Sequence, residues 1–304
     1  MARTPLTALF EAHRTVILDG AMGTELDRRG VLTTLPLWSA GALMSSPDTV
    51  RQIHSDYIAA GADIITTNTF RTTARTFRIA GLADRSAEFT HLAVSLAREA
   101  CASFPSRETL IAGSIAPLED CYRPERVPPL GALRSEHAQI ADSLAEAGVD
   151  FLLLETMGTI REACAAAEAA RRTGLEFVVS FLCTSRGCLY GGEPMAEAVG
   201  KVLSFAPSAV AINCISPRTL APALGGLQDA LRTSPGATHV ASGVYANVGV
   251  PGSEHGSLLS INVAPEEYAE FARHWARSGV RIIGGCCGTT PEHILSVHQA
   301  LHGI

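Results

Sequence analysis

Three cysteines stand where two apolar runs of the sequence end. Cys286 and Cys287 are adjacent, follow the apolar run 280–283 and have glycines on both sides, while Cys214 closes an earlier apolar run. Three cysteine thiolates form a zinc ligand set whose fourth position stays free. Because zinc binds thiols as thiolates, a substrate thiol that entered this position would become a nucleophile. The pattern predicts a zinc site that activates a thiol.

Two other interpretations of the cysteine pair compete with zinc binding. Cysteines commonly pack as small apolar residues, and an adjacent pair could also form a strained redox disulfide or end a buried strand. The glycines around the pair favour the zinc site, because small residues leave the sulfurs uncovered and allow the backbone to approach a ligand.

Two carboxylates also follow apolar runs, Asp19 and Glu155. Taken singly, each could be a helix N-cap or part of a salt bridge on a loop. Taken together they indicate an anchor for a substrate ammonium, and backbone amides near Gly20 and Thr67 could hold a carboxylate. An amino acid that carries a thiol fits all of these groups.

Eight short apolar runs, separated by helical patterns, must position these residues. Several of the helical patterns end at a glycine, as at Gly61, Gly148 and Gly279, which suits the left-handed cap of a helix. The runs are continuously apolar, which is typical of parallel strands buried on both faces. Eight β/α units predict one closed (β/α)8 TIM barrel that spans residues 1–304 as a single domain. The predicted strands are 15–18, 63–67, 110–112, 150–154, 176–181, 209–212, 239–244 and 280–283.

The barrel explains why residues far apart in sequence could share one site. Active sites of such barrels lie at the carboxyl ends of the strands, so residues directly after each run should meet on one rim. We therefore expect Asp19, Glu155 and the three cysteines to lie close together.

Composition narrows the classes of function. The 304 residues are 47% hydrophobic and 18% charged, enough for one large core. The net charge of −6, without a basic stripe, excludes nucleic acid as an expected partner. No apolar run is long enough to span a bilayer and residues 1–5 do not begin a signal peptide, so we expect a cytoplasmic protein with no membrane partner. Eight cysteines without regular spacing suit a reducing compartment.

Five segments resemble the motifs of the zinc-dependent homocysteine S-methyltransferase family, specifically its standalone homocysteine-binding domain. The resemblance extends from about residue 15 to residue 298 with the motifs in the same order, and the last motif is highly specific. The segments are ILDGAMGTE (17–25), TNTF (67–70), LET (154–156), INC (212–214) and GGCCGTTP (284–291).

The resemblance implies a (β/α)8 barrel in which Cys214, Cys286 and Cys287 hold zinc and homocysteine supplies the fourth ligand. It also implies that Asp19 and Glu155 bind the homocysteine amino group.

By the same resemblance, Gly20 and Thr67 would bind the homocysteine carboxylate. Trp38 and Phe70 look like the aromatic residues that the family places near the substrate and the methyl donor.

The reaction that the resemblance implies is methyl transfer to the zinc-bound thiolate of homocysteine, which gives methionine. The segment 36–40 resembles members that use S-methylmethionine, whereas 67–70 and 247–251 resemble the homocysteine module of cobalamin-dependent methionine synthase. We favour S-methylmethionine or S-adenosylmethionine as the donor and keep a betaine-type donor open.

Alternatives also concern the acceptor and the partners. The chain could be a homocysteine-activating module that receives the methyl group from a separate corrinoid protein, or a methyltransferase for a selenol or another thiol. A homo-oligomer is also left open.

Five cysteines lie outside the three-residue set. Cys101 and Cys164 fall in helical patterns and are expected to pack. Cys121 is expected on a loop over the barrel mouth, and Cys183 and Cys188 flank a short loop where a disulfide is conceivable but disfavoured in a reducing compartment.

Overall fold

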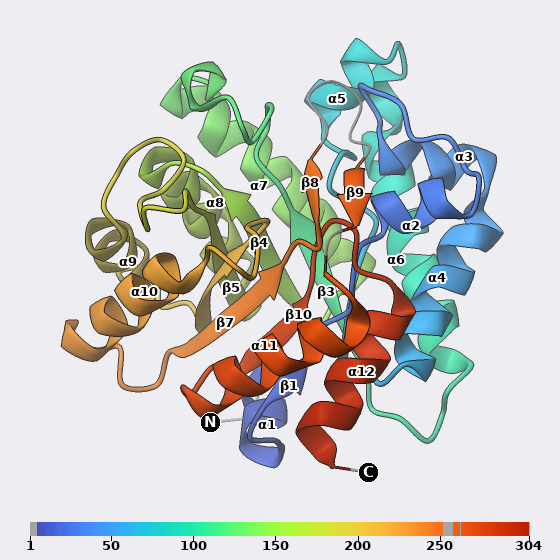
Figure 1. Ribbon diagram of the computed structural model, residues 1–304. Helices are drawn as coiled ribbons and strands as arrows, with labels where there is room; N and C mark the ends of the chain where they lie inside the picture. The colour runs from blue at the N-terminus through green and yellow to red at the C-terminus, as the bar shows by residue number, and fades with distance from the viewer. Residues whose placement is uncertain (1–4, 252–257, 262, 304) are drawn as a thin grey trace.

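Eight parallel strands form a nearly closed barrel in the computed structural model, which describes residues 5–251, 258–261 and 263–303 (Figure 1). The strands follow the order β1-β10-β7-β6-β5-β4-β3-β2 around the barrel. Their bounds are β1 Val16–Ile17, β2 Ile64–Thr66, β3 Leu110–Ile115, β4 Phe151–Met157, β5 Phe177–Leu182, β6 Ala209–Asn213, β7 Ala241–Ala246 and β10 Ile282–Gly285.

The ring closes between β1 and β2. Leu18 and Ile64 form an isolated parallel bridge, and the Asp19 amide donates to the Ile64 carbonyl oxygen at 2.9 Å. This contact completes the (β/α)8 TIM barrel and places Asp19 at the seam, directly beyond the strand.

Helices lie between the strands and cover the outside of the barrel (Figure 1). The predicted glycine caps are confirmed, because Gly61, Gly148 and Gly279 have φ values of 107°, 83° and 93°. The helices are α1 Pro5–Ala12, α2 Gly23–Arg28, α3 Ala42–Ser45, α4 Pro47–Ala59, α5 Ala74–Ile79, α6 Ser86–Ala102, α7 Leu130–Ala147, α8 Ile160–Thr173, α9 Met195–Leu203, α10 Ala221–Thr233, α11 Pro265–Arg277 and α12 Pro291–His302, with 3-10 turns η1 Ser39–Gly41, η2 Ala83–Arg85 and η3 Pro124–Arg126.

The buried apolar side chains form two main layers. The larger layer lies between the strands and the helices, as expected for strands that are buried on both faces. The smaller layer fills the barrel interior, and Leu6 and Leu9 of α1 belong to it. Helix α1 is fixed there by Glu176, whose carboxylate accepts the Leu6 amide at 2.8 Å. Together these contacts close the amino-terminal end of the barrel.

Each of the eight predicted strands is present, with differences at the ends. Strand β4 continues to Met157, and its pairing with β5 shifts between Leu154 and Met157. An antiparallel hairpin that the sequence analysis did not predict follows β7, formed by β8 (Gly249–Pro251) and β9 (Leu258–Ile261). The helices of the described residues include none that is long and apolar enough to cross a membrane. Residues 1–4, which bear on the expectation of no leader, lie outside the described residues.

Candidate active site

The three cysteines of the sequence prediction meet at the carboxyl ends of two strands. Cys214 directly follows β6, and Cys286 and Cys287 directly follow β10. Their sulfur atoms all lie within 4.8 Å of one another, and the Sγ atoms of Cys214 and Cys286 are 2.8 Å apart. All three are half-buried free thiols. The cluster could hold one metal ion.

The three thiols of the cluster differ in how readily they lose a proton. Hydrogen bonds from Cys214 and Cys286 hold the pKa of Cys287 well below its ordinary value. The hydrogen bond to Cys286 raises the pKa of Cys214 instead. Cys287 is therefore the first of the three thiols to lose its proton, and a soft cation that bound the cluster would displace the protons of the other two.

The glycines before the cysteine pair are required by close packing. A Cβ atom on Gly284 would lie 2.6 Å from the Cβ of Leu18, and one on Gly285 would lie 2.2 Å from the Thr289 hydroxyl oxygen. From sequence, these glycines were expected to leave the sulfurs uncovered. The structure adds that they let β10 lie against β1 and let the chain turn back toward Thr289.

The cysteine loop is tied to the loop after β1. The Thr289 hydroxyl donates to the Cys286 carbonyl oxygen at 2.7 Å and accepts the Ala21 amide at 3.2 Å. The Tyr57 hydroxyl lies 2.9 Å from the Ala21 carbonyl oxygen and 3.1 Å from that of Thr289. These contacts connect the loop after β1, which carries Gly20 and Ala21, to the cysteine loop after β10.

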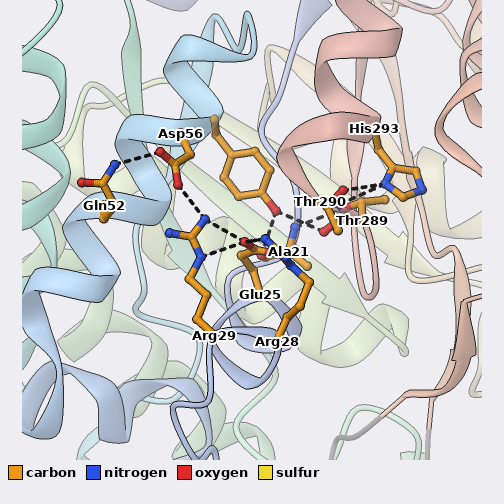
Figure 2. A network of polar contacts seen from close by, with 10 residues as sticks. Ala21, Glu25, Arg28, Arg29, Gln52, Asp56, Thr289, Thr290 and His293 are labelled. Atoms are coloured by element: carbon orange, nitrogen blue, oxygen red, sulfur yellow. Dashed lines mark hydrogen bonds and ion pairs between the residues drawn. The ribbon is translucent and has the colours of Figure 1, made fainter.

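A network of charged side chains around the buried Glu25 lies next to these two loops (Figure 2). Glu25 of α2 has a side chain with no solvent exposure and accepts hydrogen bonds from both Arg28 and Arg29. Arg29 also pairs with Asp56 of α4 at 2.6 Å, and Gln52 donates to the other oxygen of Asp56. The network anchors α2 on α4. This network was not predicted from sequence, although the arginines three and four residues after Glu25 indicate ion pairs on one face of a helix.

Asp19 and Glu155 are both buried, and both line the same cavity as the three cysteines. Asp19 accepts the Thr66 amide at 2.7 Å and the Thr66 hydroxyl at 2.9 Å, while Glu155 accepts the Ser114 hydroxyl. The pKa of each carboxyl is raised to about 8, mainly by burial, and the charge of Glu155 contributes to the shift of Asp19. A cation placed against this pair would favour the ionised carboxylates and lower the pKa of both.

A β-bulge aims Glu155 into the site. The register of β4 against β5 shifts between Leu154 and Met157, and Thr156 has a φ of 64°. The amide of Thr156 donates to the side-chain oxygen of Asn213, and the Asn213 amide donates back to the Thr156 hydroxyl. Asn213 therefore stabilises the bulge from the next strand but one and holds Glu155 in place.

Thr67 differs from the prediction that backbone amides near Gly20 and Thr67 could hold a substrate carboxylate. Its amide donates to the Ala112 carbonyl oxygen at 2.9 Å, so the sheet uses the amide that was expected to be exposed. Because the Thr69 hydroxyl donates to the Ser114 carbonyl oxygen, the Thr67 hydroxyl must donate to Thr69, and it accepts the Ser114 amide. Thr67 has no donor left for a substrate. The amide of Gly20, in contrast, has no partner within the described residues.

Two aromatic side chains form one wall of the site. The rings of Trp38 and Phe70 meet edge to face with centroids 5.6 Å apart. The Trp38 indole nitrogen is buried and has no hydrogen-bond partner among the described residues. The backbone of Trp38 has a φ of 47°, an unusual conformation for this residue type that is held by the surrounding loop.

One cavity of about 1060 Å³ joins these groups at the carboxyl ends of the strands. It is also lined by Cys121 and Cys183, while Cys101 and Cys164 pack against the outer core as expected. Cys183 and Cys188 are free thiols. The residues predicted from sequence all line the cavity: Asp19, Gly20, Trp38, Thr67, Phe70, Glu155, Cys214, Cys286 and Cys287.

The chain is similar to known proteins over nearly its whole length. A family model described as homocysteine S-methyltransferase matches residues 16–301. A homocysteine S-methyltransferase from Escherichia coli is 33% identical over 96% of this chain and 97% of its own. A selenocysteine methyltransferase from Astragalus bisulcatus is 30% identical over 96% of this chain and 94% of its own.

A solved structure agrees with the fold. The metallated form of the homocysteine methyltransferase MmuM from Escherichia coli has a TM-score of 0.81 at 32% identity, over 97% of this chain and 99% of that chain.

Proposed function

The chain belongs to the homocysteine S-methyltransferase family, and from this premise we propose that it transfers a methyl group from a small onium donor to the sulfur of homocysteine, giving methionine. The observation that carries the proposal is the meeting of a three-cysteine cluster with two buried carboxylates in one cavity. S-methylmethionine and S-adenosylmethionine are the preferred donors, with a betaine-type donor as the next choice. We also propose that residues 1–304 act as one homocysteine-binding domain.

Zinc fits the ligand set of the proposed site. Three sulfur ligands select a soft or borderline metal. Zn²⁺ is such an ion and does not change its oxidation state, which suits a methyl transfer that involves no redox step. Cys214, Cys286 and Cys287 would hold the ion, which when bound keeps the substrate sulfur deprotonated at neutral pH. The chain contributes the shape of the cluster, because Thr289 and Thr24 fix the loop through the Cys286 carbonyl oxygen and the Gly288 amide.

The two carboxylates would orient homocysteine. Asp19 and Glu155 are costly to ionise in their buried positions, and a substrate ammonium between them would stabilise both negative charges. The Gly20 amide would then bind the substrate carboxylate, with Thr67 holding the strand end beside it rather than donating. Fixing the amino-acid end at these residues leaves the thiol to reach the cysteine cluster.

The aromatic wall would receive the methyl donor. An onium methyl group is attracted to the face of an aromatic ring by about 0.5–2 kcal/mol. Trp38 and Phe70 line the cavity that also contains the cysteines, so a donor held there can face the substrate sulfur. Transfer of CH₃⁺ from the onium to the thiolate breaks one bond to the donor sulfur or nitrogen, forms one to the acceptor sulfur and neutralises both charges.

A donor panel tests the proposal. The purified zinc-loaded chain is incubated with homocysteine and, separately, S-methylmethionine, S-adenosylmethionine and glycine betaine, and methionine is measured by mass spectrometry with donors that carry a labelled methyl group. We expect labelled methionine from at least one donor with this chain alone. Transfer that appears only when a methylated corrinoid protein is added would instead identify a homocysteine-activating module.

A selenol acceptor is the second candidate function. It is favoured by the 30% identity to a protein named selenocysteine methyltransferase, and soft ligands such as selenolate suit the same metal. Competition between homocysteine and selenocysteine for one limiting donor distinguishes the two. A kcat/KM ratio above ten in favour of selenocysteine would make the selenol the preferred acceptor.

A further inference from the structure

Arg71 is a cation on the wall of the site cavity that the proposed reaction leaves unused. It directly follows Phe70, and its guanidinium carbon lies 5.7 Å from the centre of the Phe70 ring. The side chain lines the cavity and is half-buried, and its Nε atom is fully buried without a hydrogen-bond partner among the described residues. A buried guanidinium donor without an acceptor is costly, so the position is suited to a ligand that supplies one.

The acidic side chains near this part of the cavity form no ion pair with Arg71 within the described residues. Asp120, which also lines the cavity, accepts the Tyr122 amide at 3.0 Å. Glu119 and Glu136 both pair with Arg75, at 2.8 Å and 2.6 Å. Burial raises the pKa of the Cys121 thiol to about 12 and outweighs the positive charge of Arg71, which interacts with the thiol and lowers its pKa. The thiol therefore stays uncharged at neutral pH. In the part of the chain that the structure describes, Arg71 has neither an ion pair nor a hydrogen bond through its side chain.

The other arginines that line the cavity differ from Arg71 in setting. Arg123 is exposed and pairs with Glu125, and Arg126 is exposed in the turn η3. Of the three, Arg71 is the one set against the aromatic wall where the donor is proposed to bind.

Charge is distributed across the cavity in a way that orients a dipolar ligand. The acceptor side carries Asp19, Glu155 and the cysteine cluster, which attract cationic groups. Arg71 supplies positive charge beside the aromatic wall. A ligand with an onium group and a carboxylate would therefore bind with its onium toward the cysteines and its carboxylate toward Arg71.

We propose that Arg71 binds the carboxylate that each of the proposed methyl donors carries in addition to its onium group. This inference rests on the proposed function, because it assigns the second substrate of the same reaction. The planar guanidinium can donate two parallel hydrogen bonds to one carboxylate, which a lysine ammonium cannot reproduce. Onium compounds without a carboxylate would lack this contact.

Binding measured without turnover tests the inference. The zinc-loaded protein is saturated with 2-aminobutyrate, a homocysteine analogue without the thiol, and titrated calorimetrically with two matched pairs: S-methylmethionine and its carboxamide, and glycine betaine and its amide. For at least one pair we expect the carboxylate ligand to bind about ten- to a hundredfold more tightly than its amide. Arg71→Gln should remove most of that difference by weakening the carboxylate ligand alone, and Arg71→Lys should restore part of it. Arg126→Gln, on the same cavity, serves as the matched control and should leave both Kd values unchanged.

The outcomes separate this inference from the proposed function. Equal loss of affinity for the carboxylate ligand and its amide in Arg71→Gln would overturn the assignment, as would binding of neither carboxylate ligand. So would a carboxylate preference that disappears in Arg126→Gln but survives in Arg71→Gln. A separate turnover assay with homocysteine then tests the reaction: methyl transfer that is indifferent to Arg71 keeps the transferase and rejects the carboxylate contact. Arg71-dependent binding of the carboxylate ligand without any methyl transfer would keep the carboxylate contact and reject the transferase.

Discussion

The Thr289 hydroxyl donates a hydrogen bond to the Cys286 carbonyl oxygen, 2.7 Å away, and so couples the start of α12 to the cysteine loop. The same hydroxyl accepts the Ala21 amide from the loop after β1. One small side chain therefore sets the distance between the loop that carries the proposed metal ligands and the loop that carries the proposed amino-acid anchor.

Replacing Thr289 with Val should disturb both loops while keeping the side-chain shape. The change leaves the buried Ala21 amide and Cys286 carbonyl without their partner, which costs about 1–3 kcal/mol of unfolding free energy. We expect weaker zinc binding and a higher homocysteine KM. Urea denaturation and zinc titration measure the two effects, and Thr289→Ser, which keeps the hydroxyl, should stay close to the parent protein. A Val variant with unaltered zinc affinity would show that the loop is held by other contacts.

Metal content should depend on each cysteine of the cluster. We expect about one zinc per chain in the parent protein, loss of stoichiometric zinc in Cys287→Ser, and no methyl transfer by that variant. The barrel has its own large core, so circular dichroism should report an intact fold. Cys101→Ser, at a residue that packs against the outer core and does not line the cavity, is the matched control. Full activity of Cys287→Ser with stoichiometric zinc would rule out the assignment.

The amino-acid anchor predicts discrimination between thiols. Glu155→Gln keeps the shape but removes a charge-assisted hydrogen bond worth about 1.5–3 kcal/mol, so kcat/KM for homocysteine should fall roughly ten- to a hundredfold. The thiol 4-mercaptobutyrate, which lacks the amino group, should be a poor acceptor for both proteins and hardly change. Equal losses for both thiols would place Glu155 in a supporting role.

Stability of the metal-free protein should contain a falling component between about pH 4 and pH 8. The folded pKa of Asp19 and of Glu155 is about 8, above the ordinary values of 3.8 and 4.5, so over this range the folded state binds more protons than the unfolded state. The contribution is present at low pH and is lost as pH rises, at up to about 1.4 kcal/mol per pH unit for each group. Comparison with the Asp19→Asn, Glu155→Gln double variant by urea denaturation isolates this component from the cysteines. An identical pH slope in the two proteins would contradict the burial of charge at these sites.

The aromatic wall should act mainly on the donor. Trp38→Leu removes the aromatic contact with an onium group, about 0.5–2 kcal/mol, and should raise the donor KM more than the homocysteine KM. Steady-state kinetics with each substrate varied in turn measure both constants. If the two constants rise together, Trp38 serves barrel-mouth packing.

The arrangement of the barrel was readable from sequence because it depends on local patterns. Continuous apolar runs and capping glycines predicted all eight strands, and the rule that active sites lie at carboxyl strand ends brought Asp19, Glu155 and the cysteines together. These inferences needed only the order of the elements and not the contacts between them.

Features that depend on partners across the sheet were not readable. The bulge that directs Glu155 is stabilised by Asn213 from another strand, and the Thr67 amide is used by Ala112 of the neighbouring strand. Sequence spacing does not specify which hydrogen-bond partner a residue meets in the fold. The hairpin after β7 was missed for a related reason, since one strand of it, β8, is only three residues long.

The cysteine cluster also has a topological consequence. Cys214 and Cys286 are 72 residues apart in sequence, and they extend from β6 and β10, between which β7 lies in the sheet. An ion held by both would join strands that do not pair with each other and close a long chain segment into a ring. Such a crosslink lowers the entropy of the unfolded chain, as a disulfide does, but it is reversible by chelation. The intervening segment should therefore become more resistant to proteolysis when the metal is bound. The same sulfur atoms that serve the reaction would then also form a reversible crosslink that stabilises this side of the barrel.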